Sequence, residues 1–169
     1  MPLMAIGQGL QPILGFNYSC GRFDRVYDVT RYALVVSSLF SVGGFLVLML
    51  LTQPIIGLFT TDEALIVEGV RAGRFVFLAF FLVGFQFVGS TIFQALGKVV
   101  KTLVSSTSRQ ILFYIPLVLV LPRFLETDGV WLAQPAADVL SFLVVLFMVV
   151  PQLRDFRRRS ETQQSELRS

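Results

Sequence analysis

Hydrophobic residues in this chain are gathered into long uncharged runs, with the charged residues confined mostly to the stretches between them. Phe75–Gly97 holds 23 residues without a formal charge, and Tyr32–Leu51 holds 20. An α-helix rises about 1.5 Å per residue, so about 20 residues cross a hydrocarbon layer about 30 Å thick. The pattern therefore predicts helices that span a membrane.

Five membrane segments are predicted, and the first is a bent or partial helix because Pro12 and several glycines interrupt it. The charged stretches 22–31, 98–101 and 123–128 are expected to be connectors. Thr61-Asp62-Glu63 suits the start of the third helix, because side-chain oxygens and acids stabilise a first turn. The predicted segments are 1–21, 32–53, 63–97, 102–122 and 129–153.

Three prolines mark the places where these helices are expected to end or bend. Pro54 is expected to end the second segment, Pro116 to kink the fourth and Pro135 to break the fifth. The polar tail 154–169 is predicted to be cytoplasmic and to be disordered beyond its first turns.

Composition supports an all-α, polytopic membrane protein. The chain is 54% hydrophobic and 15% charged, whereas a soluble domain carries about 25% charge. The sequence lacks histidine, which removes the usual imidazole and zinc chemistry. It also lacks a nucleophile–base pair, a metal-ligand cluster and a phosphate-binding loop. We therefore expect no enzyme activity, no metal site and no cofactor.

The distribution of charge predicts an orientation. With a cytoplasmic carboxyl terminus, the 14 basic residues divide into 11 on the inside and three on the outside (71, 74 and 123). Five acidic residues lie in the outer connectors. This is the positive-inside pattern of a multi-pass protein of the cell membrane. The basic excess therefore reflects topology, and we expect no nucleic-acid partner.

Uncharged polar residues recur inside two of the predicted segments. Gln86, Ser90 and Gln94 are spaced four residues apart and so share one face of the third helix. The first segment carries Gln8, Gln11 and Asn17. Such groups either contact a passing substrate or link helices by hydrogen bonds, and the sequence leaves both interpretations open.

Two charged residues are predicted to lie deep in the membrane. Asp138 is the one acidic residue placed within a span, and Arg109 lies within the fourth segment. An ionised carboxylate at that depth costs about 3 kcal/mol unless it is paired, hydrated or protonated. Asp138 is therefore a candidate proton or cation site or a structural carboxylate. An Arg109–Asp138 ion pair is one hypothesis, and snorkelling of Arg109 to the cytoplasmic interface is the alternative.

Three stretches together resemble the multidrug and toxic compound extrusion (MATE) family of exporters. They are GQGLQPILGFNYSCGRFDRV at 7–26, FQALGKVVKTLVSSTSRQILFYIPLVLVLP at 93–122 and GVWLAQPAADVLSF at 129–142. The resemblance implies a twelve-helix fold in two lobes, of which this chain matches about helices eight to twelve of the carboxyl-terminal lobe. It also implies efflux of amphipathic organic cations by antiport with H⁺ or Na⁺.

The resemblance assigns no coupling residue to this chain. Branches of the family use acids on helices one, seven or ten. The resemblance places helices one and seven outside this chain, and Phe75–Gly97, which stands for helix ten, has no acid. The polar residues that match positions facing the interior of the lobe are candidates for the substrate or cation pathway. They are Gln8, Gln11, Asn17, Gln86 and Gln94, with Asp138 as the remaining intramembrane carboxylate.

We expect the chain to be incomplete alone, because alternating access needs two repeats and the amino-terminal lobe is missing. One alternative function is a lipid-linked sugar flippase of the same superfamily, although only Arg109 would supply the deep basic charge that it needs. The other alternative is a membrane interaction subunit that does not transport.

Overall fold

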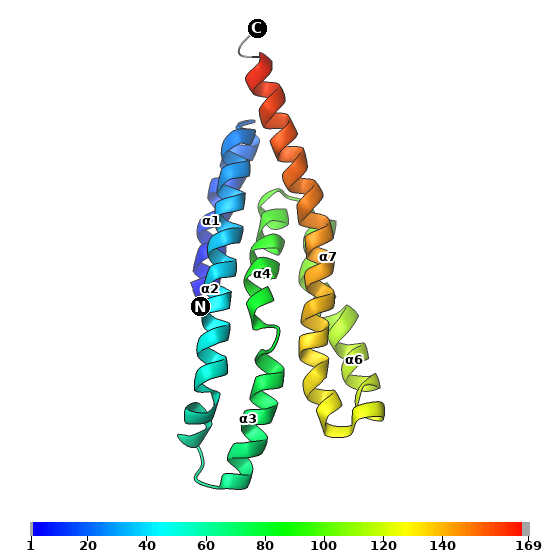
Figure 1. Cartoon of the computed structure of the whole chain (residues 1–169). Coiled ribbons are helices and arrows are strands. Elements are labelled where there is room, and N and C mark those ends of the chain that lie inside the picture. The colour runs from blue at the N-terminus through cyan, green and yellow to red at the C-terminus, as the bar shows by residue number, and fades with distance from the viewer. Residues whose placement is uncertain (1, 167–169) are drawn as a thin grey trace.

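The computed structural model describes the backbone of residues 2–166, and the side chains within it except those of 125–127, 164 and 166. Over these residues the chain is helical apart from short turns (Figure 1). The helices are α1 Pro2–Ser19, α2 Phe23–Gly57, α3 Glu63–Phe77, α4 Phe80–Ala95, α5 Val99–Thr107, the π-helix η1 Ser108–Tyr114, α6 Ile115–Val120 and α7 Pro122–Glu166.

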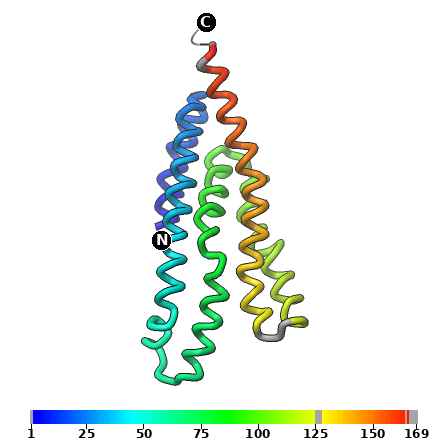
Figure 2. Tube along the Cα trace, in the orientation of Figure 1, coloured from blue at the N-terminus to red at the C-terminus, as the bar shows by residue number. Residues whose placement is uncertain are grey.

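The long helices α2, α4 and α7 run side by side, with α3 continuing the line of α4 (Figures 1 and 2). Four helical stretches in the described chain are long and apolar enough to cross a membrane: 23–57, 63–95, 99–124 and 128–163. The predicted all-α, polytopic membrane bundle is therefore confirmed.

Helix α4 forms the centre of the bundle, in contact with α1, α2, α5 and α7. Its Val88, Ile92 and Phe93 are almost fully buried. At Gly84 the helix approaches α2 so closely that a Cβ atom would overlap the backbone carbonyl of Ser37. Glycine at this position therefore sets the spacing between α2 and α4.

The predicted connectors 22–31 and 98–101 are wrong, because each shrinks to a tight turn. Gly21 and Gly97 have φ angles of 68° and 67°, a conformation that glycine adopts without steric penalty. In each turn the backbone N–H of the residue after the glycine donates to the carbonyl five residues earlier. These bonds run from Arg22 to Asn17 and from Lys98 to Phe93. This is the Schellman arrangement, and it lets the next helix begin at once.

Around the turn from α2 to α3, the capping prediction is confirmed and two helix predictions are wrong. The Asp62 carboxylate accepts a hydrogen bond of 2.9 Å from the backbone N–H of Ala64. Pro54 does not end α2, which continues to Gly57; a proline so near the end removes only one helical hydrogen bond. The predicted helix 63–97 is interrupted at 78–79.

The interruption at 78–79 lets both pieces stay against α2. On α3, a Cβ at Gly73 would lie 2.9 Å from Thr52 of α2. On α4, Phe80 packs against Gly44 of α2 and edge-on against Phe77 at 6.4 Å. Each piece keeps its own close approach to α2.

The predicted break at Pro135 is wrong, whereas the predicted loop 123–128 falls where two of the membrane-spanning stretches, 99–124 and 128–163, meet. Helix α7 begins at Pro122 and runs through Pro135; proline suits the first turn, where its missing N–H has no helical partner. The chain doubles back here, since a Cβ at Gly129 would lie 2.5 Å from the carbonyl oxygen of Leu121. Residues 125–127 of that predicted loop have no described side chains.

The predicted disorder of the tail 154–169 is wrong as far as Glu166, because α7 continues to that residue; residues 167–169 lie outside the described chain, as does Met1. Phe156 is fully buried and packs edge-on against Tyr18 of α1 at 6.2 Å. The Arg159 guanidinium lies 5.3 Å from the ring of Phe23. These contacts hold the extension against the start of α2.

The same end of the bundle carries Lys98, in the turn between α4 and α5. Its ammonium group donates to the side-chain oxygen of Gln152 on α7. Burial lowers the pKa of Lys98, and the nearby positive charge of Lys101 lowers it further. The turn is thereby held against α7 by a polar contact.

Candidate functional site

A polar cavity of about 420 Å³ lies between α4 and α5. Helix α4 contributes the predicted face Gln86, Ser90 and Gln94. Helix α5 and the start of η1 contribute a second polar face at i, i+3, i+4 and i+7 spacing, which places four side chains on one side of a helix. These four are Thr102, Ser105, Ser106 and Arg109.

A second cavity, of about 340 Å³, opens between α1 and the same face of α4. Its lining includes Gln8 and Gln11, and it shares Gln94 with the first cavity. Phe87 lines both cavities, and its ring packs so close to Gly7 that a Cβ atom at Gly7 would lie 2.8 Å from it. The two cavities are therefore neighbours along α4, and glycine in α1 permits the close approach.

Asn17 lies apart from these cavities. Its side-chain amide donates to the carbonyl of Ile13, one turn earlier in α1, at 2.8 Å. It lines neither of the two cavities. Its pathway role stays a prediction that this geometry does not favour.

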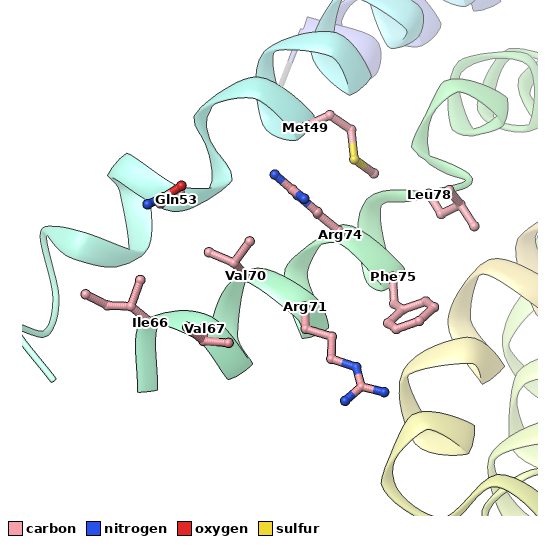
Figure 3. A pocket seen from close by; sticks show the side chains of 9 residues that line it. All are labelled: Met49, Gln53, Ile66, Val67, Val70, Arg71, Arg74, Phe75 and Leu78. Carbon is pink, nitrogen blue, oxygen red and sulfur yellow. The ribbon is translucent and has the colours of Figure 1, made fainter. Parts of the chain in front are cut away.

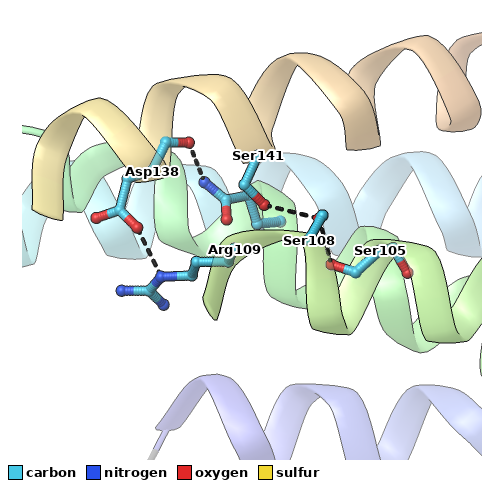
Figure 4. A network of polar contacts seen from close by, with 6 residues as sticks. Ser105, Ser108, Arg109, Asp138 and Ser141 are labelled. Carbon is cyan, nitrogen blue, oxygen red and sulfur yellow. Dashed lines mark hydrogen bonds and ion pairs between the residues drawn. The ribbon is translucent and has the colours of Figure 1, made fainter. Parts of the chain in front are cut away.

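Arg109 and Asp138, the two deep charges, lie in contact across the η1–α7 interface (Figure 4). Nε of Arg109 is 2.6 Å from Oδ1 of Asp138. The carboxylate side chain is 3% exposed and the arginine side chain 37%. The acid is therefore buried and does not line the cavity, whereas the arginine is itself part of the cavity lining.

The Arg109–Asp138 contact is an ion pair by distance, but its geometry is not that of a hydrogen bond. Within the part of the chain that the structure describes, Oδ1 of Asp138 accepts no hydrogen bond. A buried carboxylate is stabilised by charge and by hydrogen bonds together. Oδ1 is therefore held mainly by the charge of the Arg109 guanidinium.

Two further polar contacts tie α7 to its neighbours near this pair. The Gln86 side-chain amide donates to the backbone carbonyl of Asp138 at 2.7 Å. The hydroxyls of Ser108 and Ser141 lie 3.3 Å apart, both buried. Gln86 thus lines the cavity and also holds the backbone of the buried acid through its side-chain amide.

The π-helix η1 positions Arg109. It ends two residues before Pro116, which has no N–H to continue the normal i to i−4 pattern. A π-helix adds residues to a turn and so rotates the side chains that precede it. The helix distortion expected at Pro116 therefore lies in the preceding turns. In these turns Ser108 contacts Ser141 of α7 and Arg109 forms its ion pair with Asp138.

The α5 side of the cavity was not predicted from the sequence, although its signal was present. The polar residues 102, 105, 106 and 109 follow a helical spacing as regular as that of 86, 90 and 94. Thr91, which lines both cavities, was also not predicted as a site residue. The Ser108–Ser141 contact joins residues 33 positions apart, and no local pattern predicts such a pairing.

The site combines hydrogen-bonding groups with an aromatic surface. Its glutamine amides donate and accept hydrogen bonds, its serine and threonine hydroxyls do the same, and Phe87 offers an aromatic face. Among the described residues no group of three or more His, Cys, Asp or Glu side chains is placed to hold a metal ion.

A sequence model of the family described as MatE matches residues 1–120. The chain belongs to the MatE family. A relative from Bacillus subtilis (strain 168), named probable multidrug resistance protein YoeA, is 25% identical over 149 residues. That alignment covers 86% of this chain and 32% of the relative.

Solved MATE structures share the fold. The MATE multidrug transporter DinF-BH, solved in complex with a ligand, is 41% identical and superposes with a TM-score of 0.85 over 89% of this chain. Two structures of a multidrug resistance MATE transporter, inward-facing and outward-facing, give TM-scores of 0.82 and 0.81 at 16% and 17% identity. The chain spans about a third of the length of these relatives.

Proposed function

We propose that this chain is the carboxyl-terminal part of a secondary active multidrug antiporter, which exports amphipathic organic cations against an inward flow of H⁺ or Na⁺. The observation that carries the proposal is the pair of neighbouring polar cavities along α4, one facing α5 and the other facing α1, in an otherwise apolar bundle. DinF-BH, the 41% identical relative, is a multidrug transporter solved with a ligand bound. The cavity is the candidate substrate path.

In this proposal Gln86, Gln94 and Gln11 contact the substrate through amide groups, and Phe87 packs against its apolar part. Asp138 takes part in coupling. A proton or Na⁺ on its carboxylate competes with Arg109, so ion binding loosens the hold of α7 on η1. The side chain of Arg109, already at the cavity lining, then moves with the ion.

Transport needs a second repeat. Alternating access moves two repeats about a site at their interface, and the chain spans about a third of its relatives. We propose that an amino-terminal lobe, in the same polypeptide or a separate one, completes the transporter. Vesicles containing this chain alone should not move a fluorescent lipophilic cation when a proton or Na⁺ gradient is applied.

We also propose that the transporter lies in the cell membrane with its carboxyl terminus in the cytoplasm. The basic residues gather at the end of the bundle that holds Arg22, Lys98 and the extension of α7. A membrane-impermeant thiol reagent should label cysteines placed at Lys101 and Arg158 from the same, cytoplasmic side. Labelling of these two positions from opposite sides would contradict this orientation.

A chimera tests the function. This chain replaces the matching third of DinF-BH, and dye efflux is measured in everted vesicles along with the amount of folded protein. We expect efflux in the parent chimera, and at least a tenfold loss in a variant carrying both Gln86→Leu and Gln94→Leu. A matched variant, Gln53→Leu, changes an exposed glutamine outside the cavity and should retain efflux.

Two results would contradict the proposal. Unchanged efflux in the double glutamine variant would remove the cavity from the substrate path. A folded chimera without efflux would favour the membrane interaction subunit instead.

A further inference from the structure

A groove of about 650 Å³ lies between α2 and α3, on residues that the proposed transport path does not use. Its walls are mainly apolar, with Met49 on α2, Val70 and Phe75 on α3, and Leu78 directly after α3 (Figure 3). Two arginines, Arg71 and Arg74, also line it. Such a groove combines an apolar channel with positive charge, as the head and tail of a phospholipid require.

The two arginines differ in their partners. Arg71 forms an ion pair with Asp128 of α7, and Figure 3 shows its side chain pointing away from α2. Arg74 instead reaches between α2 and α3, toward Met49 (Figure 3). Among the residues whose side chains the structure describes, Arg74 makes no ion pair or hydrogen bond, so its charge is free to bind an anion from outside the chain.

The depth of Arg74 matches the level of lipid phosphates. It lies 24 residues before Lys98, which begins the opposite, basic end of the bundle. At about 1.5 Å per residue this is about 36 Å, slightly more than a hydrocarbon core of about 30 Å. Leu78 lies about 6 Å deeper, at the edge of the hydrocarbon. An acyl chain leaving a phosphate at Arg74 would therefore pass Phe75 and Leu78.

We infer that this groove binds a glycerophospholipid of the outer leaflet, with its phosphate on the Arg74 guanidinium and one acyl chain along Met49, Phe75 and Leu78. Guanidinium groups bind phosphate through two parallel hydrogen bonds, a geometry that lysine does not reproduce. A bound lipid would cover apolar side chains of α2 and α3 and neutralise a charge at the membrane edge.

The test uses the whole chain in nanodiscs that contain phosphatidylglycerol with a photoactivatable diazirine on its acyl chain. After irradiation, mass spectrometry measures labelling of 49–53 and 66–78 relative to the rest of the chain. The matched probe is a diacylglycerol with the same acyl chain and no phosphate. We expect the phospholipid to label the groove about tenfold more than the diacylglycerol does.

Variants identify the phosphate contact. Arg74→Gln should reduce groove labelling by phosphatidylglycerol about tenfold, and Arg74→Lys by less. Arg123→Gln removes another exposed arginine of the outer side and should leave groove labelling unchanged. Far-UV circular dichroism of each variant shows that the helices are intact.

Three outcomes would overturn the inference. Equal labelling by diacylglycerol would show an apolar groove without a phosphate site. Undiminished groove labelling by phosphatidylglycerol in Arg74→Gln, with intact helices, would show that lipid binding does not depend on this arginine. Crosslinks between two copies of the chain at these residues, in place of lipid adducts, would identify the groove as a protein interface.

Discussion

Arg109 and Asp138 form an ion pair whose members are unequally buried. This difference decides which substitution lowers the free energy of unfolding more. The carboxylate has almost no exposure, whereas more than a third of the arginine side chain is exposed. A charge that loses its partner is costly where solvent cannot reach it. Without its partner, the arginine can turn toward the cavity that it lines, but the carboxylate would stay buried and unpaired. Removing the arginine should therefore cost more than removing the acid.

A double-mutant cycle measures this pair. Arg109→Gln should lower the free energy of unfolding by about 3 kcal/mol and Asp138→Asn by less, and the double variant should lose clearly less than the sum. The measurement is reversible unfolding in mixed micelles, followed by circular dichroism. Additive losses would show that the contact contributes nothing to stability.

Gly84 makes a second prediction at the scale of a residue. Gly84→Ala should destabilise the fold by about 1–3 kcal/mol, because the added methyl overlaps the backbone of α2 at Ser37. Gly43→Ala is the matched control, since nothing lies within 4 Å of a Cβ there. The same unfolding assay applies, and equal stability of the two variants would contradict the close α2–α4 approach.

At the scale of elements, the sequence predicted where the apolar helices lie but not how they end. The uncharged runs were sufficient because lipid demands apolar surface along a whole span. The turns after α1 and α4 were read as connectors because charges follow Gly21 and Gly97. Their glycine caps let helices continue directly into those charges, and no residue in the sequence marks the break at 78–79.

The carboxyl-terminal extension shows a limit of the same reasoning. Residues 154–166 contain a single large apolar side chain, Phe156, so no helical periodicity is visible. The helix is stabilised by packing on α1 and α2, which depends on the three-dimensional fold. By contrast, the Arg109–Asp138 contact was predictable, because charges within a membrane are rare and need partners.

Phe156 tests this explanation of the extension. Phe156→Ala should lower the free energy of unfolding by about 3–5 kcal/mol and should make residues 157–166 exchange amide hydrogens faster. Phe147→Ala, on the same helix but with a side chain 76% exposed, is the control and should have a much smaller effect. Unchanged hydrogen exchange in Phe156→Ala would show that the extension does not depend on this contact.

At the scale of the whole molecule, α4 connects the parts that the account requires. One face packs on α2 and α7 through buried apolar residues, and the opposite face presents Gln94 and its neighbours to α1 and α5. The regular spacing of those polar residues predicted the α4 face. Their arrangement into a cavity required α1 and α5 to be placed in space, which no pattern in a single helix specifies.

The most direct test of the central claim asks whether this cavity contains water and substrate in a working transporter. In the DinF-BH chimera, with Cys20→Ser removing the native thiol, single cysteines are placed at Gln94 in the cavity and at Leu119 on the exposed apolar side of α6. We predict that a water-soluble thiol reagent labels Gln94→Cys, that a lipophilic cation slows this labelling several-fold, and that Leu119→Cys stays unlabelled. Resistance of Gln94→Cys to the reagent, or a labelling rate that the cation leaves unchanged, would contradict the account.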